Sequence, residues 1–128
     1  MSTKYKLAFA LLVGVGIGAV AVHGLHAQAG PPAFNIAEIT VTDNDGYTKE
    51  YIPAVVKSIQ DSGGKFIVRA GKTISVTGTP PAPRVVVIQF ESLDQAQAWT
   101  NSPANKAAQA IGQKYATFRS YQVEGVSP

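Results

Sequence analysis

The sequence predicts an α+β domain in which helices cover one face of a four-stranded antiparallel sheet. Three observations lead to this fold class. Short alternating or continuous apolar stretches, typical of strands, recur after residue 33. Two longer stretches place their apolar residues at helical spacing. Turn-forming glycines and prolines separate the two kinds of stretch and arrange them in the order β-α-β-β-α-β.

The first predicted strand covers residues 34–42, FNIAEITVT, whose side chains alternate between two faces. The face expected to carry the core holds Asn35, Ala37, Ile39 and Val41.

The first helical region follows at residues 43–64. Asp43 is predicted to cap it, because a carboxylate can accept hydrogen bonds from the free N–H groups of the first turn. Pro53 is expected to kink or restart the helix, since it lacks an N–H group. Gly63-Gly64 is expected to end it through a left-handed cap.

The second half of the domain supplies the other strands and the second helical region. The run RVVVIQF is predicted to be a central strand because it is almost entirely apolar. Ser102-Pro103 is expected to restart the second helix. The second strand is predicted at 65–70, with a bulge at Ala70-Gly71 and a β continuation at 72–78. The third strand is predicted at 84–90, the second helical region at 91–116 and the last strand at 118–126.

This order is that of the ferredoxin-like sandwich, which leaves one face of the sheet uncovered. A largely apolar uncovered face favours a homodimer packed sheet to sheet. The residues expected on it are Phe34, Ile36, Ile67, Val86 and Ile88, together with Glu38, Arg69, Arg84 and Gln122.

Residues 1–29 have the layout of a secretory signal peptide. Lys4 and Lys6 precede an uncharged apolar run at residues 7–22, and Ala27 and Ala29 form an A-x-A cleavage site. We expect cleavage after Ala29 and a periplasmic or secreted protein.

The alternative is that residues 7–22 are retained as an inner-membrane anchor, because the run is only slightly shorter than a membrane span. The expected organisation is a signal peptide at 1–29, an extended lead at 30–33 and the ferredoxin-like domain at 34–126.

Composition excludes several classes of function. The chain has no cysteine, and its two histidines, His23 and His26, lie in the predicted signal. The mature protein is therefore expected to contain no disulfide, no metal site and no cofactor. After residue 29 nine Lys/Arg residues stand against eight Asp/Glu residues, which gives no indication of nucleic-acid binding.

Three segments carry a family resemblance: AEITVTDNDGYTKEYIPAVVKSIQDSGGKFIVRAGK, RVVVIQFESLDQAQAWTNSP and YQVEGV. Together they resemble the domain of unknown function 1330 family, over nearly all of residues 34–126. The resemblance implies a dimeric α+β barrel, and it implies no particular activity.

The candidate ligand-binding residues are Arg69, Tyr47, Tyr51, Glu38, Arg84 and Trp99. Gly71-Lys72-Thr73 is not a phosphate loop, because Phe66 stands where that loop needs a glycine and a strand-like segment follows. Arg69 is expected to pair with Glu38, to lie at a sheet edge with its stem along apolar surface, or to hold an anionic ligand group.

Each of the other candidate residues also has two alternative roles. The two tyrosines and Trp99 can be core residues or pocket residues. Glu38 can be an ion-pair partner of Arg69 or Arg84, or a general base.

Two functions remain open on the sequence alone. One is a homodimer that binds a small molecule or has a structural role. The other is a cofactor-independent enzyme, similar to a monooxygenase or isomerase, acting on a small aromatic or quinone-like substrate.

Overall fold

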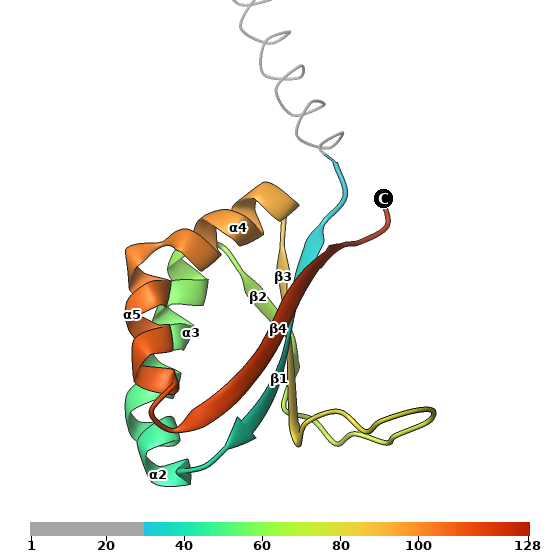
Figure 1. Cartoon of the computed structure of the whole chain (residues 1–128). Coiled ribbons are helices and arrows are strands. Elements are labelled where there is room, and N and C mark those ends of the chain that lie inside the picture. The colour runs from blue at the N-terminus through green and yellow to red at the C-terminus, as the bar shows by residue number, and fades with distance from the viewer. Residues whose placement is uncertain (1–29) are drawn as a thin grey trace, which may run out of the picture. The chain divides into compact units, whose positions relative to one another are not determined.

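The computed structural model describes residues 30–128, and the predicted signal peptide and alternative anchor lie outside the described residues (Figure 1). The elements are β1 (Ala33–Val41), α2 (Asn44–Gly46), the π-helix η1 (Tyr47–Tyr51), α3 (Ile52–Asp61), β2 (Lys65–Arg69), β3 (Arg84–Phe90), α4 (Leu93–Asn101), α5 (Pro103–Gly112) and β4 (Ala116–Glu124).

The strands form one antiparallel sheet in the order β2-β3-β1-β4, and α3, α4 and α5 lie on one side of it (Figure 1). The predicted ferredoxin-like sandwich is therefore confirmed. Within residues 30–128, none of the helices has both the length and the apolar character needed to cross a membrane.

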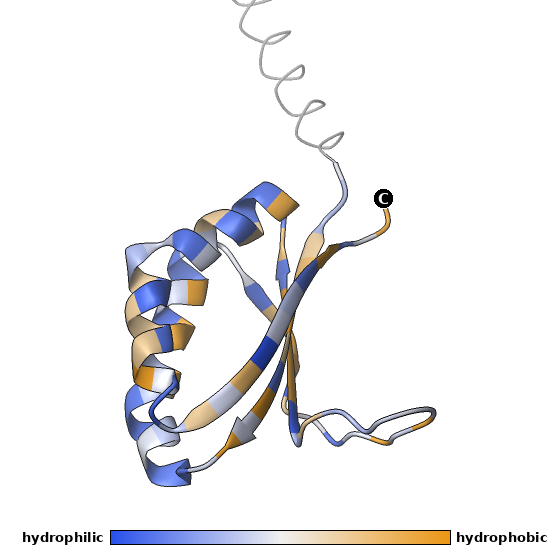
Figure 2. Ribbon diagram, in the orientation of Figure 1, coloured by the Kyte–Doolittle hydropathy of each residue, from blue (hydrophilic) through white to orange (hydrophobic). Residues whose placement is uncertain are grey.

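The core face of β1 is the predicted one. Ala33, Asn35, Ala37 and Ile39 are buried beneath the helices, whereas Phe34, Ile36 and Glu38 lie on the open face and are half-buried. Polar residues are interspersed among apolar ones along β1 and β4 in Figure 2. This contrast within β1 is what allowed its faces to be predicted correctly.

The predicted open face was wrong for three residues of β3 and one of β4. Residues directly opposite each other in adjacent strands point to the same side of a sheet. Four of the misplaced residues lie opposite core-face residues of β1, in the pairs Arg84–Ile39, Val86–Ala37, Ile88–Asn35 and Gln122–Asn35. Arg84, Val86, Ile88 and Gln122 therefore face the helices.

Arg69 was also predicted on the open face, and it too lies on the helix face. The register between β2 and β3 shifts between Phe66 and Val68, so that Phe66 pairs with Ile88 and Arg69 with Val86. The bulge thus lies inside the strand, whereas the sequence placed it at Ala70-Gly71. It reverses the alternation and turns Arg69 toward the helices.

The predicted β continuation at residues 72–78 is absent. Ala70 has a φ of 53°, a left-handed conformation that turns the chain out of the ladder. Residues 70–83, which we call the β2–β3 arm, project away from the sheet (Figure 1). The side chains of Ile74 and Val76 on this arm are 78% and 90% exposed.

The helix boundaries follow the predicted signals. Asp43 accepts hydrogen bonds from the N–H groups of Asp45 and Gly46, and Ser102 caps α5 by accepting one from Asn105. Pro53 lies near the start of α3, directly after the π-helix, in which the N–H of Ile52 bonds to the carbonyl of Tyr47. The wider turn of the π-helix accommodates Pro53, which has no backbone N–H group to donate.

Candidate functional site

A cavity of about 190 Å³ lies between the helix face of the sheet and the helices. Its walls are mostly apolar and include Ile39, Val55, Val86, Ile88 and Phe118. Five of the six predicted site residues also line it: Tyr47, Tyr51, Arg69, Arg84 and Trp99.

Glu38 is the sixth predicted residue, and the structure places it on the open face, away from the cavity. One of its carboxylate oxygens lies 2.5 Å from a guanidinium nitrogen of Arg119, and the other accepts a hydrogen bond of 3.0 Å from the N–H of Ala82. The expected pairing of Arg69 with Glu38 is therefore wrong. Glu38 instead anchors the end of the β2–β3 arm to the sheet.

The π-helix positions the two tyrosines at the cavity. Tyr47 and Tyr51 are 2% and 5% exposed, and their ring centroids lie 5.0 Å apart. Gln109 donates a hydrogen bond of 3.4 Å to the hydroxyl of Tyr51. The two tyrosines are therefore both core residues and cavity residues. Segments of π-helix occur often at functional sites.

Burial keeps both tyrosines protonated. Desolvation raises the pKa of Tyr47, while the nearby charges of Arg84 and Arg69 act in the opposite direction. Burial also raises the pKa of Tyr51, with a smaller contribution from Tyr47. At neutral pH both hydroxyls can donate a hydrogen bond, and neither is poised to accept a proton as a base.

The two arginines reach the cavity from adjacent strands. The guanidinium carbon of Arg84 lies 5.1 Å from the ring centroid of Tyr47, and that of Arg69 lies 4.5 Å from the ring centroid of Phe66. The Nε of Arg84 is buried and has no hydrogen-bond partner among the described residues. Among these residues, no aspartate or glutamate lines the cavity.

Trp99 has a packing role and a cavity role. Its ring lies 5.4 Å from that of Phe90, and its indole N–H donates to the hydroxyl of Ser58, which in turn donates to the carbonyl of Val55. Trp99 is the only tryptophan of the chain, so its fluorescence reports on the cavity that it lines.

Sequence reasoning missed a group of polar residues in the cavity wall. Asn105 is buried and donates to the carbonyl of Thr100, and Gln109 donates to the side-chain oxygen of Asn105. These residues lie in or beside α4 and α5, where a polar residue normally indicates a solvent-exposed position. Asn35 on the predicted core face of β1 was the one signal that could have pointed to them, because a buried amide needs partners.

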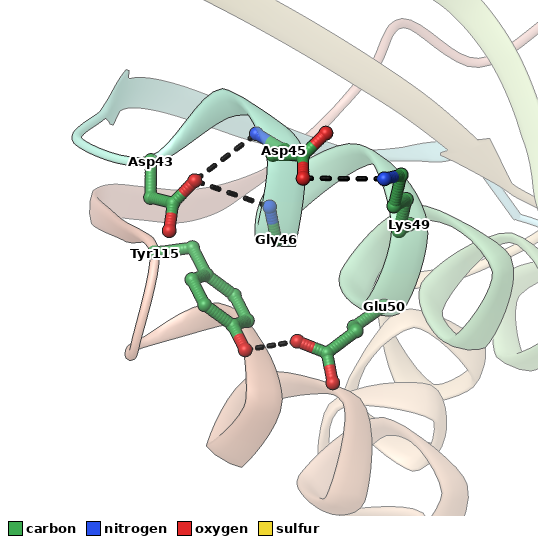
Figure 3. Close-up of polar contacts among 6 residues, drawn as sticks. All are labelled: Asp43, Asp45, Gly46, Lys49, Glu50 and Tyr115. Atoms are coloured by element: carbon green, nitrogen blue, oxygen red, sulfur yellow. Dashed lines mark hydrogen bonds and ion pairs between the residues drawn. The ribbon is translucent and has the colours of Figure 1, made fainter.

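Asp43 and Asp45 are not among the residues that line the cavity, and both stabilise the first turns of the helical region. Figure 3 shows Asp43 capping the helix start, Asp45 paired with Lys49, and the hydroxyl of Tyr115 bonded to Glu50. Across residues 30–128 there is no cluster of three or more histidine, cysteine, aspartate or glutamate side chains that could hold a metal ion.

These features define the class of protein: a ferredoxin-like α+β domain with a cavity between its sheet and its helices. The family described as "Domain of unknown function (DUF1330)" matches residues 32–126, and the chain belongs to this family. The resemblance noted in the sequence is thereby confirmed. No curated protein matches the chain.

Solved structures show the same fold. A protein of unknown function from Rhodopseudomonas palustris aligns with a TM-score of 0.61 at 12% identity, over 84% of this chain and 94% of that chain. The methylated form of that protein gives a TM-score of 0.50 at 14% identity, over 84% and 92%. At these identities the likeness concerns the fold alone.

Proposed function

We propose that this protein binds a small molecule in the cavity between its sheet and its helices, and that it acts as a homodimer. The observation that carries the binding proposal is the cavity itself, whose mostly apolar wall holds a few inward polar groups. Such a combination is typical of small-molecule sites. The volume of about 190 Å³ suits a compact ligand, since an apolar cavity of about 150 Å³ holds one benzene ring.

The test is native mass spectrometry of the protein purified gently from its own host. We expect a dimer that carries extra mass. Ala37 lies in the cavity wall, so Ala37→Leu should fill part of the cavity and remove the extra mass. Ala107 is exposed on α5, and Ala107→Leu is the matched control that should keep it. A ligand-free protein that also binds none of a set of ring-sized probes would contradict the proposal.

The homodimer is proposed to form through the open face of the sheet. No helix covers that face in residues 30–128 (Figure 1). Its apolar side chains include Phe34, Ile36, Val87, Tyr121 and Val123, and the last two are each 46% exposed. A contiguous apolar surface of this kind favours a partner, and an identical copy offers a matching surface through two-fold symmetry.

Light scattering across a dilution series tests the dimer. Ile36 lies opposite Val87 near the middle of the open face, so Ile36→Lys should give a folded monomer. A lysine on the exposed surface of α5, Ala107→Lys, is the control and should leave the dimer intact. A parent protein that stays monomeric at micromolar concentration would overturn this part of the proposal.

The second candidate function is a cofactor-independent enzyme acting on a small aromatic or quinone-like substrate. Its support is the group of two arginines and two neutral tyrosines, which could stabilise an anionic form of a substrate. Among the described residues, the cavity wall contributes no carboxylate or imidazole that could act as a base. Oxygen uptake with small hydroquinones distinguishes the two functions. The binding proposal expects no difference between the parent and Ala37→Leu.

Export is also part of the proposal, and it is supported by the signal-like layout of residues 1–29. Intact mass measurement of the protein from its host should give a chain that starts at Gly30. A chain that retains residues 7–22 and fractionates with membranes would support the anchor instead.

A further inference from the structure

Arg69 and Arg84 lie side by side on the helix face at one end of the cavity. Arg69 pairs with Val86 in the ladder between β2 and β3, and Arg84 lies two residues from Val86 and therefore on the same face. The N–H of Ala70 bonds to the carbonyl of Val85 at 2.9 Å, which extends the pairing to this end of the sheet. The two residues are thus diagonal neighbours on one face of the sheet, with Arg84 half-buried and Arg69 exposed.

Within residues 30–128, neither arginine has an acidic partner. The ion pairs in residues 30–128 are Lys49–Asp45, Lys57–Asp61 and Arg119–Glu38. The buried Nε of Arg84 has no hydrogen-bond partner within this part of the chain. A buried donor without a partner is costly, so this group needs a partner from outside the chain, either an ordered water or a ligand atom.

A third donor lies at the same cavity. Tyr47 lines it together with both arginines, and its ring centroid lies 5.1 Å from the guanidinium carbon of Arg84. Burial keeps the hydroxyl protonated and able to donate. The cavity end therefore presents two guanidinium groups and one hydroxyl, all of them donors and none of them acidic. This is the complement of a carboxylate.

The remainder of the cavity requires an apolar ligand body. Phe66, Val86, Ile39, Val55 and Phe118 form much of the wall, and the volume of about 190 Å³ leaves room for one ring or a short branched chain. A free phosphate or sulfate would leave this apolar volume without contacts. A ligand with several charges would also place charges that the arginines do not contact in apolar surroundings, which is costly.

We propose, building on the small-molecule function above, that the ligand is a compact monocarboxylate with a single ring or short chain. Its carboxylate lies between Arg84 and Arg69 and accepts a hydrogen bond from Tyr47. Its apolar body lies against the sheet and α3. The arginines thus select the charge, and the volume between the apolar walls limits the size.

Benzoate and benzamide are the probes that test this inference, because they have nearly the same shape and differ in charge. Binding is followed by Trp99 fluorescence and by calorimetry at pH 7. We expect benzoate to bind at least about ten-fold more tightly than benzamide, since each charged hydrogen bond contributes on the order of a ten-fold effect. Added salt should weaken benzoate more than benzamide.

Arg84→Gln removes one charge at the site, and Arg119→Gln removes one from the open face. We expect Arg84→Gln to weaken benzoate at least about ten-fold while leaving benzamide nearly unchanged. Arg119→Gln should change neither. Arg84→Lys keeps the charge and should restore part of the preference, and circular dichroism checks that each variant is folded.

The outcomes separate the two proposals. If benzamide binds as tightly as benzoate and Arg84→Gln affects neither, the cavity binds small molecules and the carboxylate inference is overturned. If neither probe binds and neutral single-ring molecules such as toluene and benzyl alcohol also fail, both proposals are overturned. Preference for benzoate that persists in Arg84→Gln but disappears in Arg119→Gln would place the anion on the open face and would also refute the inference.

Discussion

Gly112 determines how closely α5 approaches the tyrosines. A Cβ atom added at this glycine would lie 2.6 Å from a ring carbon of Tyr51, well inside van der Waals contact. Tyr51 in turn packs against the tilted rings of Tyr47 and Phe118 in the cavity wall. A single hydrogen in place of a side chain thus sets the position of the ring, and through it the shape of the cavity.

Gly112→Ala is therefore expected to destabilise the protein by about 1–3 kcal/mol, because overpacking forces the ring or the helix to shift. Urea unfolding measures the change. Gly71 has nothing within 4 Å of an added Cβ, so Gly71→Ala should leave the stability equal or slightly higher. Equal stabilities for the two variants would show that the Tyr51 ring moves aside freely.

The raised pKa of Tyr51 makes the stability depend on pH in the alkaline range. The unfolded chain ionises near the ordinary value of 10.0, whereas burial keeps the folded tyrosine protonated at that pH. The stabilisation is therefore fully present below about pH 10 and is lost as the pH rises further. Tyr51→Phe should make unfolding between pH 9.5 and 11 less pH-dependent, by up to about 1.4 kcal/mol per pH unit. An unchanged pH dependence would contradict the buried phenol.

At the scale of elements, the sequence predicted those strands whose two faces differ in composition. In β1 the alternation of polar and apolar residues set the core face correctly. The run of β3 is apolar on both faces, so its phase could not be read from the sequence, and Arg84, Val86 and Ile88 were assigned to the wrong side.

The same dependence on local pattern explains which residues of the candidate site were predicted correctly. Tyr47 and Tyr51 were found because their spacing by four places them on one helix face. Arg69 reached the cavity through a bulge, which shifts the faces by one residue without any glycine or proline to signal it. Glu38 was chosen for its charge, and its partner Arg119 comes from a strand far along the chain.

The end of β2 depends on the left-handed conformation of Ala70. Glycine adopts this conformation without the steric penalty of a Cβ atom, so Ala70→Gly should leave the stability equal or raise it by up to about 1 kcal/mol. Ala107 is exposed within a regular helix, where the same substitution should lower the stability by about 1 kcal/mol. Thermal unfolding of the two variants checks the opposite signs, and equal losses would contradict the strained backbone at Ala70.

At the scale of the whole molecule, the two proposed activities use opposite sides of one sheet. The helix face forms the cavity, and the open face is the proposed dimer surface. The β2–β3 arm begins next to Arg69, a cavity residue, and it returns to Glu38 on the open face. Its apolar side chains are exposed within the part of the chain that the structure describes, which fits contact with a second copy.

Replacing both Ile74 and Val76 by serine tests this contact. The two side chains are 78% and 90% exposed, so the double variant should leave the folding of the single chain unchanged. If the partner covers them, dimer dissociation should become at least about ten-fold easier, because each buried aliphatic side chain contributes about 1.5–3 kcal/mol. Sedimentation at several concentrations measures this. Val126→Ser, at an equally exposed site near the C-terminal end, is the control. A double variant that dissociates like the parent would restrict the dimer contact to the sheet face itself.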